Sequence, residues 1–167
     1  MRLADGPTES ASIEIAADAD TVWRFVADID LPARFSDEFR GGEWLDGATG
    51  PAPGARFHGH NRRGDVEWTV TCTVTRCEPG HLLEWVVEDP SDPVAWWRFT
   101  ITPTVSTPAG AGVVLEQWCR MGTAASGLTM AIDRRPDREE QIVERRMQRH
   151  RESMSATIAG VKELAES

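Results

Sequence analysis

The sequence contains no tyrosine among its 167 residues, which limits the polar chemistry that an aromatic pocket could offer. It does contain seven tryptophans and five phenylalanines. Tryptophan brings a large apolar ring and a single hydrogen-bond donor, whereas the tyrosine hydroxyl both donates and accepts. A pocket lined by the aromatic residues of this chain would therefore be mostly apolar, with few groups to anchor a polar ligand.

Cysteine is also scarce, and its spacing excludes the common cysteine-based sites. Cys72, Cys77 and Cys119 are the only three, and none of them forms a Cys-x-x-Cys pair. An odd number without such spacing indicates a reducing compartment, where free cysteine behaves as a small hydrophobic residue. Because the N-terminus also lacks the apolar core of a signal peptide, we expect a cytoplasmic protein.

Positive charge and long hydrophobic runs are lacking as well. The formal net charge is -9, which disfavours a nucleic-acid partner and an anionic membrane surface. No apolar run approaches the roughly 20 residues needed to cross a bilayer. We therefore expect neither nucleic-acid binding nor membrane insertion. The length suits one domain that can bury a core without metal or disulfide support.

The most informative pattern that is present is a long amphipathic helix, predicted over residues 136–167. Its apolar residues recur at alternating spacings of three and four, which places them in one stripe. Asp137 and Glu140 predict a capping box at its start. The stripe consists of Val143, Met147, His150, Met154, Ile158, Val161 and Ala165.

The middle of the chain predicts short strands separated by Gly and Pro turns. Residues 66–77 are the clearest, because apolar side chains alternate there with Thr and Glu. Short turns between successive strands predict antiparallel pairing. A loop is expected around Pro108 and Gly110. The predicted strands are residues 10–15, 43–45, 56–62, 66–77, 81–88, 94–102 and 111–121.

The remaining segments complete an α+β fold. Two short helices are expected between the first two strands, at residues 19–28 with Asp18 as N-cap and at residues 33–38. Residues 122–133 predict another helical turn or two. A sheet of about seven strands should twist and curl around the long helix. Residues 1–9 show no periodicity and are expected to form a flexible tail, which leaves residues 10–167 as a single ligand-binding domain.

Several short stretches carry a resemblance to a known family. They are Ser12-Ile13-Glu14-Ile15, Ala19-Asp20-Thr21-Val22-Trp23, Asp28-Ile29-Asp30-Leu31-Pro32, residues 54–62, residues 77–85 and residues 110–115. In this order they resemble the START-like (SRPBCC) helix-grip superfamily, in particular its polyketide cyclase/dehydrase-like branch. The resemblance spans nearly the whole chain and implies a curved seven-stranded antiparallel sheet around a long C-terminal helix. Phe35 departs from it, because relatives often place a Trp there.

The resemblance and the strand alternation together predict a cavity between the sheet and the helix. A curled sheet stands off from a single helix, so a ligand-sized space is expected there, although a filled core remains the alternative. The predicted lining is aromatic and apolar, which suits a flat hydrophobic, aromatic or polyketide-like ligand. The predicted lining residues are Phe57, Gly59, Asn61, Trp68, Val70, Cys72, Trp85, Trp97, Phe99, Met147, His150 and Met154.

Three polar residues stand at predicted inward positions, and each has two interpretations. Asn61 and Gln117 could orient a ligand carbonyl or hydroxyl, or could satisfy nearby backbone. Gly59 could admit a ligand or a close approach of the backbone. His150 could exchange a proton with a bound enol or hydroxyl, or be an ordinary core histidine. The sequence favours the core histidine, because no neighbouring carboxylate would orient a general base.

No cofactor or metal site is predicted. His58 and His60 have a spacing that can chelate zinc or iron, but they are predicted to point outward and lack a third ligand. A nucleophile elbow and a Gly-rich phosphate loop are also missing from the sequence.

Three functions are consistent with these patterns. The leading hypothesis is a protein that binds a small hydrophobic molecule in the cavity. The second is a cyclase, dehydratase or isomerase acting on a poly-β-carbonyl compound, with His150, Asn61 and Gln117 as its candidate catalytic residues. The third is a protein-interaction module or homodimer, in which a partner would cover Leu128, Met130 and Ile132.

Overall fold

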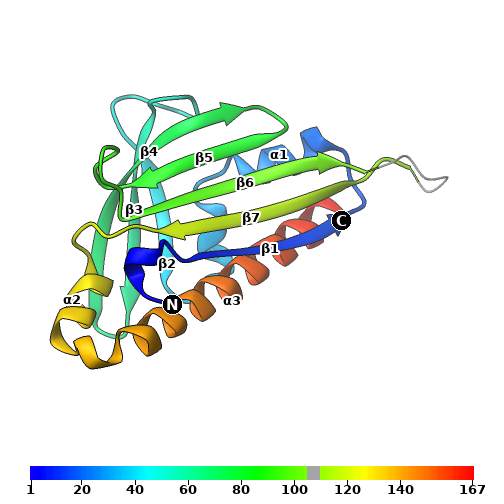
Figure 1. Cartoon of the computed structure of the whole chain (residues 1–167). Helices are drawn as coiled ribbons and strands as arrows, with labels where there is room; N and C mark the ends of the chain where they lie inside the picture. The colour runs from blue at the N-terminus through cyan, green and yellow to red at the C-terminus, as the bar shows by residue number, and fades with distance from the viewer. Residues whose placement is uncertain (105–109) are drawn as a thin grey trace.

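A single curved antiparallel sheet lies over one long helix in the computed structural model, which describes residues 1–104 and 110–167. The strands pair in the order β1-β7-β6-β5-β4-β3-β2. Figure 1 shows α3 running along the sheet beside β1 and β7. The strands are β1 (Thr8–Ile15), β2 (Phe39–Trp44), β3 (Arg56–Arg63), β4 (Val66–Glu78), β5 (Leu82–Val87), β6 (Ala95–Pro103) and β7 (Val113–Met121).

The helical elements occur before β2 and after β7. Asp18 is the N-cap of α1, where its carboxylate accepts a hydrogen bond from the Thr21 backbone N–H at 2.8 Å. None of the helices in the described part of the chain has both the length and the apolar composition that crossing a membrane requires. The elements are η1 (Leu3–Asp5), α1 (Ala19–Val26), η2 (Leu31–Arg34), α2 (Gly127–Arg134), η3 (Pro136–Arg138) and α3 (Glu139–Ala165).

The long helix runs parallel to β1 and is attached to it along its whole length. Polar contacts join α3 to β1 and to the residues before and after this strand, so the register of α3 on the sheet is fixed. The pairs are Leu3 N–H with Glu139 Oε1, Arg151 with Glu9, Lys162 Nζ with Glu14 O, and Ala16 N–H with Glu166 Oε1.

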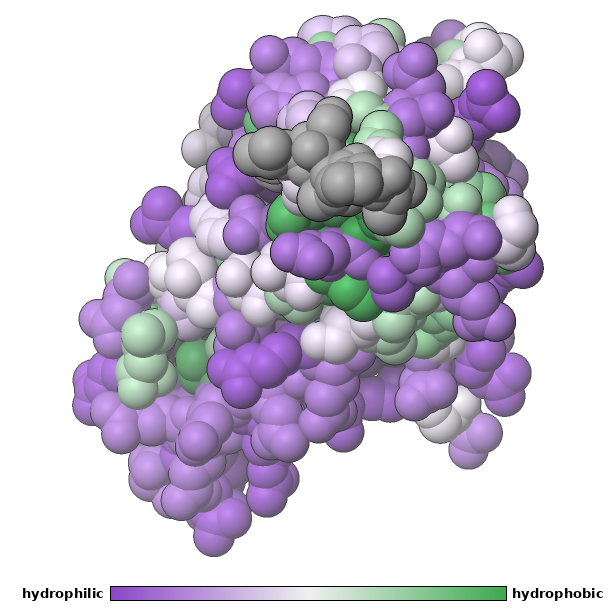
Figure 2. Space-filling view, turned by 90° about the vertical axis from the view of Figure 1, so that its right-hand side faces the viewer, coloured by the Kyte–Doolittle hydropathy of each residue, from purple (hydrophilic) through white to green (hydrophobic). Residues whose placement is uncertain are grey.

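The core lies between the inner face of the sheet and the apolar stripe of α3. Strand alternation sends one set of side chains inward, and Ile101 and Leu115 are fully buried there against Met154 and Val161. The outer face carries charged and aromatic pairs, such as Arg98 over the Trp118 ring. Hydrophilic residues also cover most of the end at which α3 finishes, where hydrophobic ones form only a small area (Figure 2).

The first nine residues differ from the predicted flexible tail. Leu3 is only 5% exposed, and Pro7 is buried as well. Strand β1 begins at Thr8 and pairs with β7 from that residue onward. This segment packs on the rest of the protein through single side chains and a 3-10 turn rather than through a regular face. Its sequence therefore shows no periodicity that would predict its structure.

The start of the long helix also differs from the prediction. The predicted capping box at Asp137 does not form, because Asp137 pairs with Arg135 at 3.1 Å and Arg138 precedes the helix without a side-chain cap. Pro136 begins a separate 3-10 turn, which moves the first residue of α3 to Glu139. The second short helix is a 3-10 turn at Leu31–Arg34, earlier than the predicted residues 33–38.

Other boundaries shift by smaller amounts. Strand β2 covers Phe39–Trp44 rather than residues 43–45. The predicted turns between residues 122 and 133 form α2, which begins at Gly127. Of the predicted loop around Pro108 and Gly110, Pro108 lies outside the described residues.

Candidate functional site

A row of aromatic rings crosses the inner, concave face of the sheet. The Phe57 and Trp85 ring centroids are 6.2 Å apart, and Trp85 stacks on Trp97 at 6.5 Å with an interplanar angle of 11°. Phe99 lies 5.9 Å from Trp85. The row ends on α3, where the His150 ring meets Trp97 edge-on at 4.9 Å. Strands β3, β5 and β6 and helix α3 therefore build one aromatic surface.

The strand register explains why these rings meet. Trp85 and Trp97 are directly opposite each other on β5 and β6, so their side chains share a face. Phe57 on β3 pairs with Cys72 on β4, which is also buried on the inner face. The alternation that predicted these positions as inward is thus confirmed by the pairing.

The helix leaves part of this surface accessible. Helix α3 packs chiefly on β1 and also on β7, while α1 packs on β6. Trp85 and Trp97 stand near the middle of the sheet and face inward, yet both remain only half-buried. Val70 on β4 is half-buried as well. These three side chains pack against the core yet keep some contact with solvent, while two grooves on the protein are lined by other residues.

Two buried polar atoms beside the row have no hydrogen-bond partner among the described residues. They are Gln117 Oε1 on β7 and His150 Nε2 on α3. Gln117 is 6% exposed and His150 is 8% exposed. An unpaired buried polar group costs roughly 1–3 kcal/mol, so such atoms are uncommon in folded proteins.

His150 is an uncharged imidazole at neutral pH. Burial lowers its pKa from 6.5 to about 3, and the positive charge of Arg146 on the same helix contributes to the shift. Arg146 itself forms a two-pronged ion pair with Glu38, with N–O distances of 2.9 and 3.1 Å. This pair joins α3 to the segment that precedes β2. Sequence patterns did not reveal it, since the two residues are 108 positions apart.

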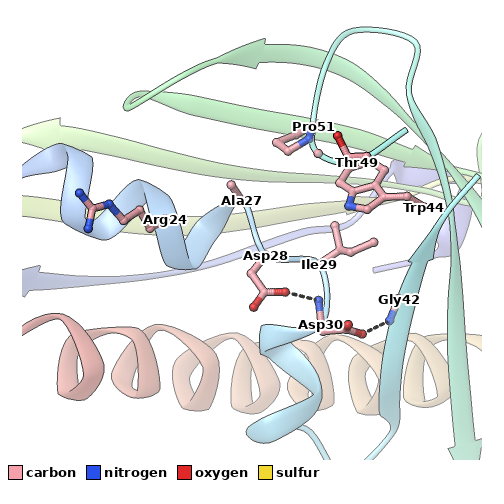
Figure 3. Close-up of a pocket in the computed structure, with 10 residues that line it drawn as sticks. Arg24, Ala27, Asp28, Ile29, Asp30, Gly42, Trp44, Thr49 and Pro51 are labelled. Carbon is pink, nitrogen blue, oxygen red and sulfur yellow. Dashed lines mark hydrogen bonds between the residues drawn. The ribbon is translucent and has the colours of Figure 1, made fainter. Parts of the chain in front are cut away.

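A groove with a volume of about 440 Å³ opens at one end of the aromatic row. It lies between the segment that follows α1 and the loop that joins β2 to β3, with the Trp44 indole between them (Figure 3). Trp44 pairs with Phe57 and meets its ring edge-on at 5.4 Å. The row is therefore continuous from Trp44 to His150. Trp44 was not among the predicted lining residues, although its place in the predicted strand 43–45 could have indicated it.

The two carboxylates at this groove are already used by the backbone. Asp28 Oδ1 accepts a hydrogen bond from the Asp30 N–H at 2.9 Å, and Asp30 Oδ1 accepts one from the Gly42 N–H at 2.8 Å. Both bonds are visible in Figure 3. These aspartates shape the edge of the groove.

Asn61 and Trp68 lie away from the centre of the row. Asn61 is four residues beyond Phe57, about 13 Å along β3. Its Nδ2 donates to the Gly59 carbonyl at 3.4 Å, and it pairs with Trp68. Both residues border a second open groove of about 430 Å³. The structure thus separates Asn61 from Gln117 and His150, the other two predicted polar candidates.

Close packing explains why residue 59 is a glycine. A Cβ atom at this position would lie 3.3 Å from Val70 Cγ2 and 3.4 Å from Phe39 Cε2. The missing side chain therefore makes room for neighbouring side chains.

The burial and contacts of the remaining candidate site residues are those of ordinary structural side chains. Met147 and Met154 are buried in the stripe of α3. Burial raises the pKa of the Cys72 and Cys119 thiols to about 12, so both stay protonated. His60 Nδ1 lies 3.0 Å from Thr69 Oγ1. Within residues 1–104 and 110–167 there is no group of three or more potential metal ligands.

The hydrophobic residues proposed for a partner surface are only partly available. Met130 is 55% exposed, whereas Leu128 and Ile132 pack against the core.

Comparison with protein families decides the classification. The model of the family described as polyketide cyclase / dehydrase and lipid transport matches residues 8–148. The chain belongs to this family. Its sheet and long C-terminal helix form the helix-grip fold of START-like proteins, as the sequence resemblance predicted. No curated protein matches the chain.

Solved structures share this fold at low sequence identity. A polyketide-cyclase-like protein from Corynebacterium glutamicum is 23% identical, with a TM-score of 0.62 over 97% of this chain and 90% of that one. The Zhui aromatase/cyclase from a Streptomyces species is 17% identical, with a TM-score of 0.64 over 95% and 93% of the two chains. A START superfamily protein from Mycobacterium smegmatis is 12% identical, with a TM-score of 0.57 over 91% and 97%. At these identities the likeness establishes the fold alone.

Proposed function

We propose that this protein binds a flat, largely apolar small molecule on the concave face of the sheet, beside α3. The observation that carries the proposal is the half-burial of Trp85 and Trp97, two inward-facing rings near the middle of the sheet. A planar ligand laid on these rings would remove their apolar area from water and gain stacking contacts.

The groove at Trp44 supports the same function. A ligand that enters there would meet aromatic rings continuously from Trp44 through Phe57 to Trp85.

Binding fits the polar groups better than proton transfer does. The family description covers both cyclases or dehydrases and lipid transport, so membership alone does not choose between them. A general base works best when its pKa lies near the working pH. The pKa of His150 is about 3, which makes its imidazole a weak base at neutral pH. We therefore propose a carrier or receptor for a small molecule rather than a cyclase.

Calorimetric titration with 2-methoxynaphthalene, a flat aromatic ether, tests this proposal. We expect measurable binding, and we expect Trp97→Ala to weaken it about tenfold by removing a stacking face. Trp118→Ala is the matched control, because Trp118 lies on the outer face against Arg98 and should leave the affinity unchanged.

Far-UV circular dichroism of both variants would confirm that the sheet is intact. Failure of the wild-type protein to bind this ether and its relatives 2-naphthol and 2-naphthoate would refute the proposal, as would equal affinity of the wild type and Trp97→Ala for the ether.

A further inference from the structure

We propose that the bound molecule carries a neutral hydroxyl group, which Gln117 and His150 hold at the α3 end of the aromatic row. The hydroxyl donates its hydrogen to Gln117 Oε1 and accepts a hydrogen bond from the N–H at His150 Nε2. This inference rests on the proposed function and specifies the class of ligand.

The first support is the unmet hydrogen-bonding capacity of both side chains. Gln117 and His150 are each more than nine-tenths buried, and Gln117 Oε1 and His150 Nε2 lack partners among the described residues. An amide oxygen can only accept, while an imidazole nitrogen can donate in one tautomer. A hydroxyl group satisfies both atoms at once, because it donates one hydrogen bond and accepts another.

The second support is that the strand register brings the two side chains to the same ring. Trp97 on β6 pairs with Cys119, and Phe99 pairs with Gln117, so Gln117 is the diagonal neighbour of Trp97 on the same face. The His150 ring contacts Trp97 directly, at 4.9 Å between centroids. Gln117 and His150 therefore flank the ring on which the ligand would lie.

The attachment of α3 to β1 places Gln117 and His150 at neighbouring levels along the strands. Arg151, next to His150, pairs with Glu9, and Glu9 is opposite Cys119. Gln117 lies one inward position further along β7, opposite Ala11. Both side chains therefore lie on the inner face close to Trp97.

The third support concerns charge, and it excludes an acidic group at this position. His150 is uncharged, and the amide oxygen of Gln117 would repel a carboxylate. The cation whose charge acts on His150 is Arg146, and Glu38 already pairs with it through two hydrogen bonds. A carboxylate here would be a buried charge facing two uncharged side chains, which is unfavourable.

A matched set of three naphthalene derivatives tests the inference by calorimetry at neutral pH. 2-Naphthol carries the hydroxyl, 2-methoxynaphthalene keeps the oxygen but cannot donate, and 2-naphthoate is an anion. We expect 2-naphthol to bind about tenfold more tightly than the ether, the gain typical of one added buried hydrogen bond. We expect 2-naphthoate to bind at least tenfold more weakly than the ether.

Substitution of the acceptor provides the second arm. Gln117→Leu keeps a side chain of similar size but removes Oε1, so the roughly tenfold preference for 2-naphthol over the ether should disappear. If far-UV circular dichroism shows that this variant is unfolded, Gln117→Met offers the same test with an unbranched side chain.

The outcomes separate this inference from the proposed function. Equal affinities of 2-naphthol and the ether for the wild-type protein would mean that water satisfies both polar atoms, and would overturn the inference while the proposed function stands. Tighter binding of 2-naphthoate would overturn it as well. Failure of all three compounds to bind would remove the proposed function and the inference together.

Discussion

His150 illustrates how the surroundings of one residue decide its chemistry. Histidine ordinarily titrates near neutral pH, which made this residue a candidate for proton transfer. In the stripe of α3 it loses contact with water, and Arg146 stands one turn away on the same helix. Both effects disfavour the charged imidazolium form. His150 is therefore better suited to a neutral hydrogen bond than to carrying a proton.

This shift predicts a specific loss of stability in mild acid. In the unfolded chain His150 binds a proton below about pH 6.5, while in the folded protein it does so only below about pH 3. Its contribution to stability is thus complete above pH 6.5 and declines as the pH falls from 6.5 toward 3. Between pH 7 and pH 5 the wild type should lose about 2 kcal/mol of unfolding free energy relative to His150→Phe.

Urea unfolding of both proteins at the two pH values measures this difference. Comparison with the variant cancels the contributions of the other titrating groups, including the ion-paired carboxylates. Parallel stabilities of the two proteins across this range would show that His150 is not held in its neutral form.

At the scale of the elements, one glycine sets how closely the η2 segment approaches α3. A Cβ atom at Gly160 would lie 2.5 Å from Cε1 and Cε2 of Phe35, the residue that ends η2. The ring therefore lies directly on the helix backbone. This contact holds the segment between α1 and β2 against the long helix.

Gly160→Ala should consequently destabilise the protein by about 1–2 kcal/mol, because the cost of overpacking exceeds the gain from better helix propensity. Thermal or urea unfolding measures the change. Gly127→Ala in α2 is the control, since nothing lies within 4 Å of an added Cβ there, and it should cause no loss.

The double variant Gly160→Ala with Phe35→Leu identifies the cause. If the ring is responsible, the two substitutions should couple, and the double variant should lose less stability than the sum of the single losses. Additive losses would assign the effect to another contact.

At the scale of the whole molecule, the two ends of the chain are parts of one structure. Strand β1 pairs with β7, and the final helix runs beside β1 from Glu139 to Glu166. The first residues therefore stabilise the last ones. Pairing between such distant segments also implies slower folding than in a helical bundle of similar size.

Leu3→Ala tests this dependence directly. Because Leu3 is only 5% exposed, the substitution should lower the unfolding free energy by about 2 kcal/mol. Met1→Ala, at a side chain that is 68% exposed, should change it by less than about 0.5 kcal/mol. Identical stability of the two variants in urea would instead support the flexible tail that the sequence suggested.

Much of the inner face could be predicted from the sequence, because strand alternation is a local property. Trp85, Trp97 and Phe99 were predicted to face inward together, and the register confirms that they do. Val66–Glu78 forms the strand with the clearest period-two pattern. Asn61 was predicted to lie in the same site as Gln117 and His150. A strand pattern predicts the face on which a side chain lies but not its position along the strand.

Features that depend on distant contacts could not be predicted. The burial of Leu3 depends on α3, and the ion pair between Glu38 and Arg146 joins residues 108 positions apart. Trp44 joins the aromatic row only through its pairing with Phe57 across β2 and β3. No pattern within a short window of sequence records these relations.

Periodicity and short motifs are local features, and they sufficed to predict the family, the order of the elements and the inward face of the strands. Which inward residues remain accessible, and which polar atoms lack partners among the described residues, depends instead on what the folded chain brings to each side chain. In this protein, that is the position of α3 over one side of a curved sheet.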